Sequence, residues 1–301
     1  MRIAILLSTY NGEKYLVPQI SSLLSQKFSG TVKICVRDDG SSDKTVDILR
    51  EYEKEEKISL SIGENLGSAK SFLHLLKDNP GYDYYAFCDQ DDIWFNTKIQ
   101  RAVDKIKSYN IPALYSSNAR LVNGDLSDTG RNVHNHCPVT NIYGLSCEGG
   151  HIGCTMVFNK ELASAALESG LPENVLCHDA FMSLLCVAIN GALVYDKEPS
   201  LLYRRHDNNA TDVPRGLKNT LKNRFAIING SNYTDIAGQA NAVLEISKES
   251  IDEEKRSWLE QVSRYKESFM ARIKLSLSRK TKYQSLNSSI TNRIAIVFGN
   301  K

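Results

Sequence analysis

Short apolar runs alternate with amphipathic stretches over the first ninety or so residues of the chain. Apolar runs over residues 3–7 and 84–88 predict buried strands, and short segments rich in apolar residues over 32–36 and 58–62 predict two further strands. Between these runs, apolar residues recur at helical spacing and predict helices over about residues 13–27, 43–55 and 68–77. Strands that alternate with helices through short loops predict a parallel sheet with right-handed crossovers, so we expect an α/β fold.

The pattern becomes less regular after residue 95, and the elements it predicts are shorter. Helices are expected over about residues 96–108, 159–168 and 179–190, and strands near residues 112–116, 152–158, 192–195 and 200–203. The polar stretch 124–148 predicts irregular structure. Beyond residue 212 the pattern is helical and shows no strands, so we predict a boundary there between an α/β domain and a helical C-terminal region, 213–301.

Charge is distributed unevenly along the 301 residues, although the net charge is only +2. Residues 213–301 contain sixteen Lys or Arg and eight Asp or Glu, a local charge of +8, so residues 1–212 carry −6. The basic stretch begins with Arg215 and Lys218. A basic region on an acidic body predicts contact with an anionic surface, such as lipid headgroups. The alternative is a set of helices that pack on the body and expose their charges to solvent.

The seven cysteines predict a reduced compartment. Their number is odd, the chain is long, and no pair has the Cys-x-x-Cys spacing. The apolar run at the N-terminus is too short for a signal peptide, and no run reaches the length of a membrane span. We therefore expect a cytoplasmic protein that meets the cytoplasmic face of the inner membrane at most peripherally.

Three carboxylates follow the fourth predicted strand within four residues: Asp89, Asp91 and Asp92. A strand that ends in Asp-x-Asp places these groups at the carboxyl edge of the sheet, where open α/β folds bind ligands. Like charges this close repel one another unless a cation is present. Mg²⁺ and Mn²⁺ are bound through carboxylates together with substrate phosphates. The cluster therefore predicts a metal–diphosphate site, and an acidic loop that caps the next helix is the alternative.

Polar motifs follow the predicted strands in a fixed order. They read Ser-Thr-Tyr-Asn-Gly, Asp-Asp-Gly-Ser-Ser-Asp, Asn-Leu-Gly, Asp-Gln-Asp-Asp and His-Asp, at residues 8–12, 38–43, 65–67, 89–92 and 178–179. The ordered set resembles the inverting nucleotide-sugar glycosyltransferases of family two, over about residues 1–210. The resemblance implies the GT-A fold, a Rossmann-like, mostly parallel sheet flanked by helices. It also implies a nucleotide-binding half over about 1–95 and an acceptor half over about 96–212.

The resemblance implies a donor nucleotide in contact with Thr9, Tyr10 and Asp38. Asp38 would accept the N3–H of uracil or thymine, so it does not distinguish UDP-sugars from dTDP-sugars. The alternative for this motif is a turn followed by a helix cap. Lys70 matches a basic residue that the family often has near the nucleotide, although an isolated Lys on a helix is more often a solvated charge.

The resemblance also implies a role for each carboxylate of the acidic cluster. Asp91 would bind Mn²⁺ or Mg²⁺ directly, with His206 completing the metal site, and Asp89 would lie near the ribose and the sugar. Asp92 would bind hydroxyls of the donor sugar, and Arg204 would hold the diphosphate. A lone His is usually an ordinary surface or core residue, so the position of His206 in the chain carries its prediction.

Asp179 matches the general base, which takes the proton from the acceptor hydroxyl as that oxygen attacks the anomeric carbon. The alternative is a residue that caps the helix at 179–190. The family usually has an acidic residue before the base, whereas this chain has His178, which we expect near the acceptor. The resemblance places Trp94, Gly150 and His151 on the acceptor side as well, although Trp94 is equally expected as a plain core aromatic.

Together these residues predict a metal-dependent hexosyltransferase that acts on a growing, lipid-linked glycan of the cell surface, with no nucleic-acid partner. Residues 88–94 and 203–209 resemble bacterial rhamnosyltransferases of O-antigen and capsule assembly, so we favour L-rhamnose from dTDP-rhamnose. A galactosyl- or glucosyltransferase that uses a UDP-sugar is the alternative. A nucleotidyltransferase should have a glycine-rich basic loop at residues 8–12, which this chain lacks. A non-catalytic nucleotide-sugar or glycan-binding protein is a further hypothesis.

Overall fold

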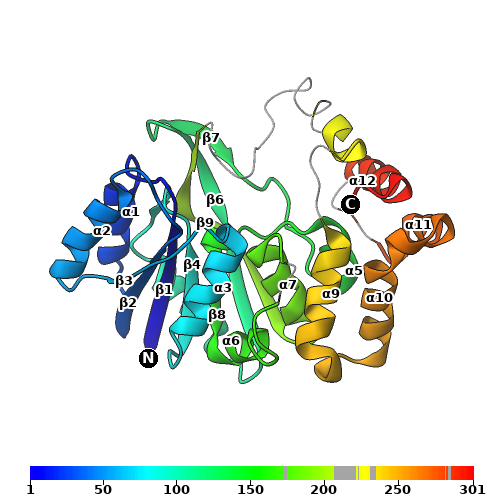
Figure 1. Cartoon of the computed structure of the whole chain (residues 1–301), viewed down its shortest axis with the longest axis horizontal. Helices are drawn as coiled ribbons and strands as arrows, with labels where there is room; N and C mark the ends of the chain where they lie inside the picture. The colour runs from blue at the N-terminus through cyan, green and yellow to red at the C-terminus, as the bar shows by residue number, and fades with distance from the viewer. Residues whose placement is uncertain (173–174, 207–221, 223, 231–234, 282, 284–285) are drawn as a thin grey trace.

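A curled sheet forms the centre of the molecule (Figure 1). The computed structural model describes residues 1–172, 175–206, 222, 224–230, 235–281, 283 and 286–301. In the first half of the chain, four parallel strands lie in the spatial order β3-β2-β1-β4. Their bounds are β1 (Arg2–Thr9), β2 (Thr31–Asp38), β3 (Ser59–Ile62) and β4 (Tyr84–Cys88). The predicted parallel order is therefore confirmed for this half, and the bounds of the strands differ from the predicted ones by at most two residues at either end.

The second half of the sheet is mixed. Its strands are β5 (Ile93–Trp94), β6 (Ala113–Asn123), β7 (Asp128–Asn132), β8 (Val157–Asn159) and β9 (Ala192–Arg205). Strand β8 is antiparallel to both β4 and β6, whereas β9 is parallel to β6. The two strands predicted at 192–195 and 200–203 are one strand, because a register shift opposite residues 117–120 lets β9 bend and continue along β6.

Helices cover both faces of the sheet (Figure 1). Their bounds in the body are α1 (Leu16–Leu24), α2 (Thr45–Lys54), α3 (Ser68–Asp78), α4 (Lys98–Ile106), α5 (Ile142–Glu148), α6 (Lys160–Ala166) and α7 (His178–Ala188). Side chains of β1 alternate between two core clusters: Ala4 and Leu6 face α3 and α7, whereas Ile3, Ile5 and Leu7 face α1 and α4. A strand that is buried on both faces has a continuous apolar sequence, and for this reason β1 could be predicted from residues 3–7.

The stretch 124–148, predicted to be irregular, contains both β7 and α5. Strand β7 has no apolar residue in its sequence Asp-Thr-Gly-Arg-Asn and is stabilised by pairing with β6. Helix α5 begins at Asn141, whose side chain accepts a hydrogen bond from Gly144 N. The prediction for this stretch was therefore wrong, because β7 has no apolar residues and α5 has only a short apolar pattern, formed by Ile142 and Leu145.

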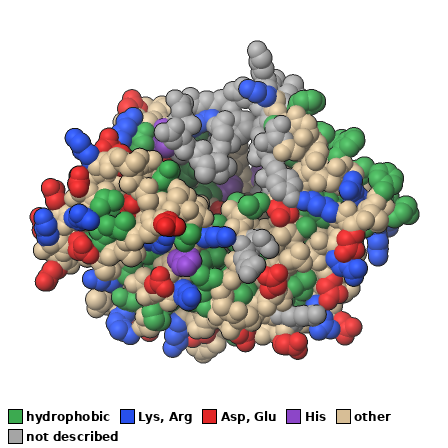
Figure 2. All heavy atoms as spheres, in the orientation of Figure 1, with side chains coloured by type: hydrophobic (Ala, Val, Ile, Leu, Met, Phe, Trp, Pro, Cys, Tyr) green, Lys and Arg blue, Asp and Glu red, His purple; other side chains and the backbone are tan. Residues whose placement is uncertain are grey.

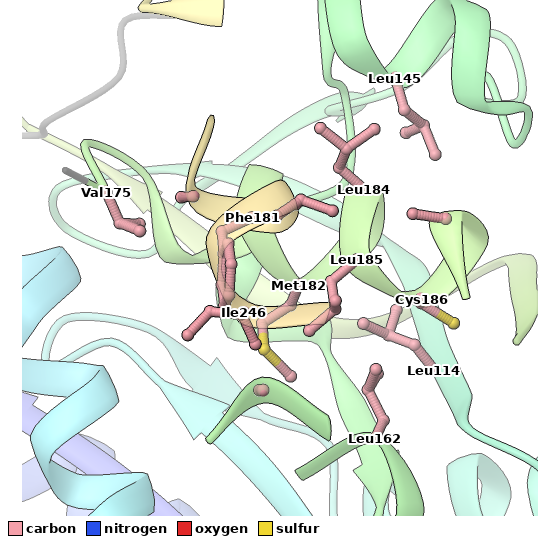
Figure 3. Close-up of a cluster of buried hydrophobic side chains, with 14 of the residues drawn as sticks. Leu114, Leu145, Leu162, Val175, Phe181, Met182, Leu184, Leu185, Cys186 and Ile246 are labelled. Atoms are coloured by element: carbon pink, nitrogen blue, oxygen red, sulfur yellow. The ribbon is translucent and has the colours of Figure 1, made fainter. Parts of the chain in front are cut away.

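The described part of the C-terminal region is helical, as predicted, and packs on the body. Its helices are α9 (Ile236–Ser247), α10 (Glu253–Ser263), α11 (Phe269–Ser276) and α12 (Leu286–Phe298). Figure 3 shows Phe181 and Met182 of α7 beside Ile246 of α9, within one cluster of buried side chains. Packing of this kind agrees with the simpler alternative for the basic region. The boundary predicted near residue 212, like Arg215 and Lys218, lies outside the described residues.

Across the described ranges, we find no helix that combines the length and the apolarity needed to cross a bilayer.

Candidate active site

The loops that follow β1, β2 and β4 meet at one edge of the sheet. The parallel register pairs Thr9 with Asp38, and Leu7 with Cys88, so the residues after these strands emerge side by side. This edge is the position where open α/β sheets bind their ligands. The space-filling view shows that this face of the molecule is hollowed in its upper middle, where His side chains are visible (Figure 2).

The carboxylate of Asp38 is fully buried and holds the loop that follows β2. Its Oδ2 accepts hydrogen bonds from Thr9 Oγ1 at 2.9 Å and Ser41 Oγ at 2.6 Å, and its Oδ1 accepts one from Ser41 N at 2.9 Å. Asp39 is paired with Arg37. These contacts are those of the turn alternative. Asp38 Oδ1 could still accept one more hydrogen bond, but the carboxylate is buried, so a base would reach it only if the loop moved.

Tyr10 is half exposed, and its backbone is held by Gln90 of the acidic loop. Gln90 Oε1 accepts from Tyr10 N, and Gln90 Nε2 donates to Tyr10 O, each at 2.9 Å. A side chain at position 12 would overlap Gln90, so Gly12 is required for this close approach. The Tyr10 ring is thus presented at the edge of the site. Lys70 lies exposed on α3.

Asp91 and His206, which are 115 positions apart in the sequence, meet in the structure. Asp91 Oδ2 lies 2.7 Å from His206 Nε2, and both side chains are largely buried. The His206 ring stacks on Tyr15, with ring centroids 4.5 Å apart. Arg204 Nε donates to the backbone oxygen of Asp91 at 2.8 Å, and Arg204 Nη1 donates to Gly124 O at 2.9 Å. The guanidinium group of Arg204 therefore holds the backbone of the acidic loop at Asp91 in this structure.

One carboxylate oxygen of Asp92 is buried without a hydrogen-bond partner among the described residues. Its Oδ1 accepts from Arg204 N at 3.2 Å, whereas its Oδ2 has no hydrogen-bond partner among the described residues. Possible ligand atoms of Asp89, Asp92 and Cys154 all lie within 4.8 Å of one another. A cation would satisfy the buried oxygen. The carboxylates and His206 are donors suited to Mn²⁺ or Mg²⁺, whereas the Cys154 thiol suits softer metals, so the residues present fit the predicted ion.

The carboxylates of this cluster perturb one another. Burial, followed by the charges of Asp91 and Asp179, raises the pKa of Asp89 to about 7. Burial and the charges of Asp91 and Asp89 raise the pKa of Asp92 well above its usual range. Desolvation disfavours an ionised carboxyl group, and so does a nearby like charge. The influence of Asp179 on Asp89 also shows that the predicted base lies close to the acidic cluster.

Lys98 is a buried cation beneath the cluster. Its Nζ donates to Cys154 O at 2.6 Å and lies 3.3 Å from the ring centroid of Trp94. Burial lowers the pKa of Lys98 to about 8, and the charges of Asp92 and Asp89 act in the opposite direction. Trp94 itself is only 2% exposed and belongs to the core, as the simpler alternative for this residue states.

Asp179 lies in the first turn of α7, half-buried. Its Oδ2 accepts a hydrogen bond from Gly153 N at 3.3 Å. The residue that caps α7 is Cys177, and its side chain makes no capping bond, so Asp179 is not the N-cap of this helix. The neighbouring His178 is buried, with its ring 4.1 Å from that of Phe72. A Cβ at position 153 would lie 2.5 Å from His178 Nε2, so this packing depends on Gly153.

The two residues predicted on the acceptor side at 150–151 differ in access. Gly150 is exposed, with a positive φ of 120° that favours glycine. His151 is 5% exposed; its Nδ1 lies 2.6 Å from Ser116 Oγ and its Nε2 lies 3.0 Å from Val139 O. In this structure His151 is therefore buried between Ser116 and Val139 and is not exposed at the site.

Sequence reasoning missed Tyr15, Gln90, Lys98 and Cys154. Lys98 had a usable signal, because it precedes Ala102 by four residues and so shares the buried face of α4. Gln90 lies inside the acidic motif, which also could have drawn attention to it. Tyr15 and Cys154 stand in segments with no pattern that separates them from ordinary residues.

Residues 4–156 match the model of the family described as Glycosyl transferase family 2. This match spans half of the chain, so the chain belongs to that family and is a glycosyltransferase. Over 252 residues it is 29% identical to the dTDP-rhamnosyl transferase RfbG of Shigella flexneri. This alignment covers 80% of this chain and 86% of the relative. It is also 28% identical to the UDP-Glc:alpha-D-GlcNAc-diphosphoundecaprenol beta-1,3-glucosyltransferase WfaP of Escherichia coli, over 52% of this chain and 59% of the relative.

Solved structures of glycosyltransferases share the fold. The crystal structure of S. aureus TarS 1-349 in complex with UDP-GlcNAc matches with a TM-score of 0.56 and 16% identity, and covers 99% of this chain and 91% of that chain. The mannosyltransferase PcManGT from Pyrobaculum calidifontis, in complex with GDP-Man and Mn²⁺, matches with a TM-score of 0.52 and 12% identity, over 99% and 86% of the two chains. The predicted GT-A fold is thereby confirmed.

Proposed function

We propose that this enzyme transfers a sugar, with inversion, from a nucleoside-diphosphate donor to a hydroxyl group, and that Mn²⁺ or Mg²⁺ assists the reaction. The observation that carries the proposal is the pairing of Asp91 with His206 beside Asp89 and Asp179, at the ligand-binding edge of the sheet. These groups come from three separate segments, after β4, on α7 and after β9.

Asp179 is the proposed general base. It takes the proton of the acceptor hydroxyl while that oxygen forms a bond to the anomeric carbon of the donor. The bond between this carbon and the diphosphate breaks at the same time, and the diphosphate leaves with the electron pair. The bond from Gly153 N orients the carboxylate of Asp179. Inversion follows from a single displacement in which the base and the leaving group lie on opposite sides of the sugar.

The proposed metal ligands are Asp91 and His206, with Asp89 and Asp92 nearby. A divalent ion bound there would supply Lewis-acid stabilisation of the leaving diphosphate. Arg204 fixes the backbone of Asp91, and Tyr15 supports the His206 ring, so both ligands are held by neighbours that do not themselves bind the ion. Tyr10, exposed at the same edge, is placed to contact the nucleoside.

The proposed donor is dTDP-rhamnose, with L-rhamnose as the sugar. A relative that aligns with 80% of this chain supports this proposal, because it is named a dTDP-rhamnosyl transferase. The second candidate is UDP-glucose, supported by two glucosyltransferase relatives, WfaP and WfgD of Escherichia coli. The names of both also contain a diphosphoundecaprenol group, which supports a lipid-linked acceptor at the cytoplasmic face of the membrane.

The test is donor-sugar hydrolysis without acceptor, with Mn²⁺ or Mg²⁺, across a panel of UDP- and dTDP-sugars. We expect one donor to be hydrolysed by the wild type and not by an Asp91→Ala variant. Asp104→Ala, on the exposed side of α4 and paired there with Lys107, is the matched control and should retain hydrolysis. Metal-independent hydrolysis, or full activity in Asp91→Ala, would reject the metal site. Preference for UDP-glucose would select the second candidate.

A further inference from the structure

A polar cavity of about 400 Å³ is lined by residues outside the proposed active site. It is formed by β6, by the segment that follows β7 and by β9. Residues that line it include Asn118, Asn132, His134, Cys137, Tyr195 and Lys197. Its size is within the range of small-molecule sites, roughly 300–1,000 Å³. The proposed roles in donor binding and catalysis use none of these residues.

Two buried polar atoms in the cavity wall have unused hydrogen-bonding capacity. Neither Tyr195 Oη nor His134 Nε2 has a partner among the residues that the structure describes. The two rings lie 6.2 Å apart between centroids, at a steep angle of 76°. Both atoms are covered in this structure, and a buried polar atom without a partner is unfavourable, so a turn of either ring toward the cavity would be favoured by a ligand that can hydrogen bond to it.

The cavity adjoins the proposed base through a short segment of chain. The ring of Tyr195 is 6.0 Å from the ring of His151. Two residues after His151, the backbone of Gly153 donates its hydrogen bond to Asp179. In addition, Tyr195 is paired in register with Ser116, whose hydroxyl contacts His151. A molecule in the cavity would therefore lie on the acceptor side, separated from Asp179 by the segment 151–153.

The chemistry of the wall suits a neutral molecule rich in hydroxyl groups. Among the described residues that line the cavity, Lys197 is the one side chain with a fixed charge. Burial, with a smaller effect of His151, lowers the pKa of His134 to about 4, so this ring is neutral near pH 7. Amide side chains and a neutral imidazole both donate and accept hydrogen bonds, as sugar hydroxyls do. A phosphate would favour several cationic donors.

We propose that this cavity binds a sugar ring of the acceptor glycan, and that the Tyr195 and His134 side chains turn toward it so that Tyr195 Oη and His134 Nε2 hydrogen bond to its hydroxyls. This inference rests on the proposed function, since it assigns the cavity to the acceptor of that transfer. The bound ring would be one next to the ring that carries the reacting hydroxyl. The cavity would thus select the acceptor, while the edge of the sheet selects the donor.

Cys137 offers a direct measurement, because its thiol is exposed and lines the cavity. The rate of its reaction with N-ethylmaleimide, followed by peptide mass, is measured with methyl α-L-rhamnoside, methyl α-D-glucoside, methyl N-acetyl-α-D-glucosaminide or inorganic phosphate present. We expect at least one glycoside to protect Cys137 and phosphate to give no protection. The exposed Cys177, which does not line the cavity, is an internal control in the same digest.

Tyr195→Phe should weaken the protecting glycoside roughly two- to tenfold, the loss expected for one hydrogen bond. Tyr109→Phe, an exposed tyrosine away from the cavity, should bind like the wild type. His134→Asn gives a second, independent variant. The proposal would be overturned if no glycoside protects Cys137 or if phosphate protects it. It would also be overturned if a glycoside protects the wild type, Tyr195→Phe and His134→Asn equally. Donor hydrolysis without acceptor, measured on the same wild-type sample, tests the proposed function separately.

Discussion

The acidic cluster should lower the stability of the metal-free protein, and Asp89→Asn should show this. Burial and the charges of Asp91 and Asp179 raise the pKa of Asp89 to about 7. Ionisation of Asp89 is therefore more difficult in the folded chain than in the unfolded chain, where the ordinary value is near 3.8. Replacing the carboxylate by the isosteric amide removes this penalty and keeps the shape of the side chain.

The direction and size of the effect depend on pH. Below about pH 4 the carboxyl group is protonated in both states, so the variant gains nothing. Between the two pKa values the unfolded chain binds fewer protons, so wild-type stability falls as pH rises, and above about pH 7 the penalty is constant. About three pKa units at about 1.4 kcal/mol each give an upper bound of about 4 kcal/mol for the stabilisation of Asp89→Asn at pH 8.

The assay is urea unfolding in EDTA at about pH 5 and about pH 8, which gives the free energy of unfolding of each protein. The free energy of unfolding of Asp89→Asn should exceed that of the wild type by more at the higher pH. Asp104→Asn is the control of opposite sign, because hydrogen bonds from Lys107 and Gln100 lower the pKa of Asp104. An Asp89→Asn variant that is less stable than the wild type at pH 8, or equally stabilised at both pH values, would refute the reasoning.

Three further predictions concern other parts of the molecule. Trp258→Ala should lower the free energy of unfolding by about 3–5 kcal/mol, measured in urea, because the ring is 4% exposed and its Nε1 donates to Ser146 Oγ at 2.9 Å. His206→Gln should weaken Mn²⁺ binding at least about tenfold in a calorimetric titration. Wild-type stability should fall as pH drops from 6.5 towards 4, by up to about 3 kcal/mol from His134, and His134→Asn should flatten this dependence in acid urea titrations.

Each of these three has a result that would contradict it. A loss below about 1 kcal/mol for Trp258→Ala would mean that α10 does not pack on the body in solution. Unchanged Mn²⁺ affinity in His206→Gln would remove that residue from the proposed metal site. A wild type and a His134→Asn variant with parallel acid profiles would show that the His134 ring is charged in the folded protein at mildly acidic pH.

The half of the fold that the sequence predicts well is the half whose strands are buried on both faces. The strands β1 and β4 contain continuous apolar runs, β2 contains one interrupted by Lys33, and turn residues follow each. The strand β7 could not be predicted in this way, because its five residues are polar and it forms only against β6. Context of this kind outweighs intrinsic strand preference. The bend that joins the two predicted strands into β9 also depends on its neighbour β6.

The candidate site shows the same division. Proximity of Asp89, Asp91 and Asp92 follows from their places in the chain, whereas the meeting of Asp91 and His206 depends on pairing between β9 and two strands, β5 and β6. The resemblance to a family supplied that pair, and periodicity did not. Burial of Trp94, His151 and His178 likewise depends on tertiary packing, so their low exposure could not be predicted from the sequence, and their contact with the acceptor stays a prediction.

The charge balance of the cluster links its cost to its proposed use. Among the described residues, four carboxylates stand against two buried cations: Asp89, Asp91, Asp92 and Asp179 against Lys98 and Arg204. The raised pKa values of Asp89 and Asp92 mean that the metal-free cluster carries less charge than this near pH 7, whereas with all four carboxyl groups ionised the difference is two negative charges, which one divalent ion would neutralise. Fewer carboxylates would make the metal-free fold more stable but would bind the ion less well. The stabilisation expected for Asp89→Asn and the activity loss expected for Asp91→Ala therefore have one physical origin, a surplus of buried negative charge.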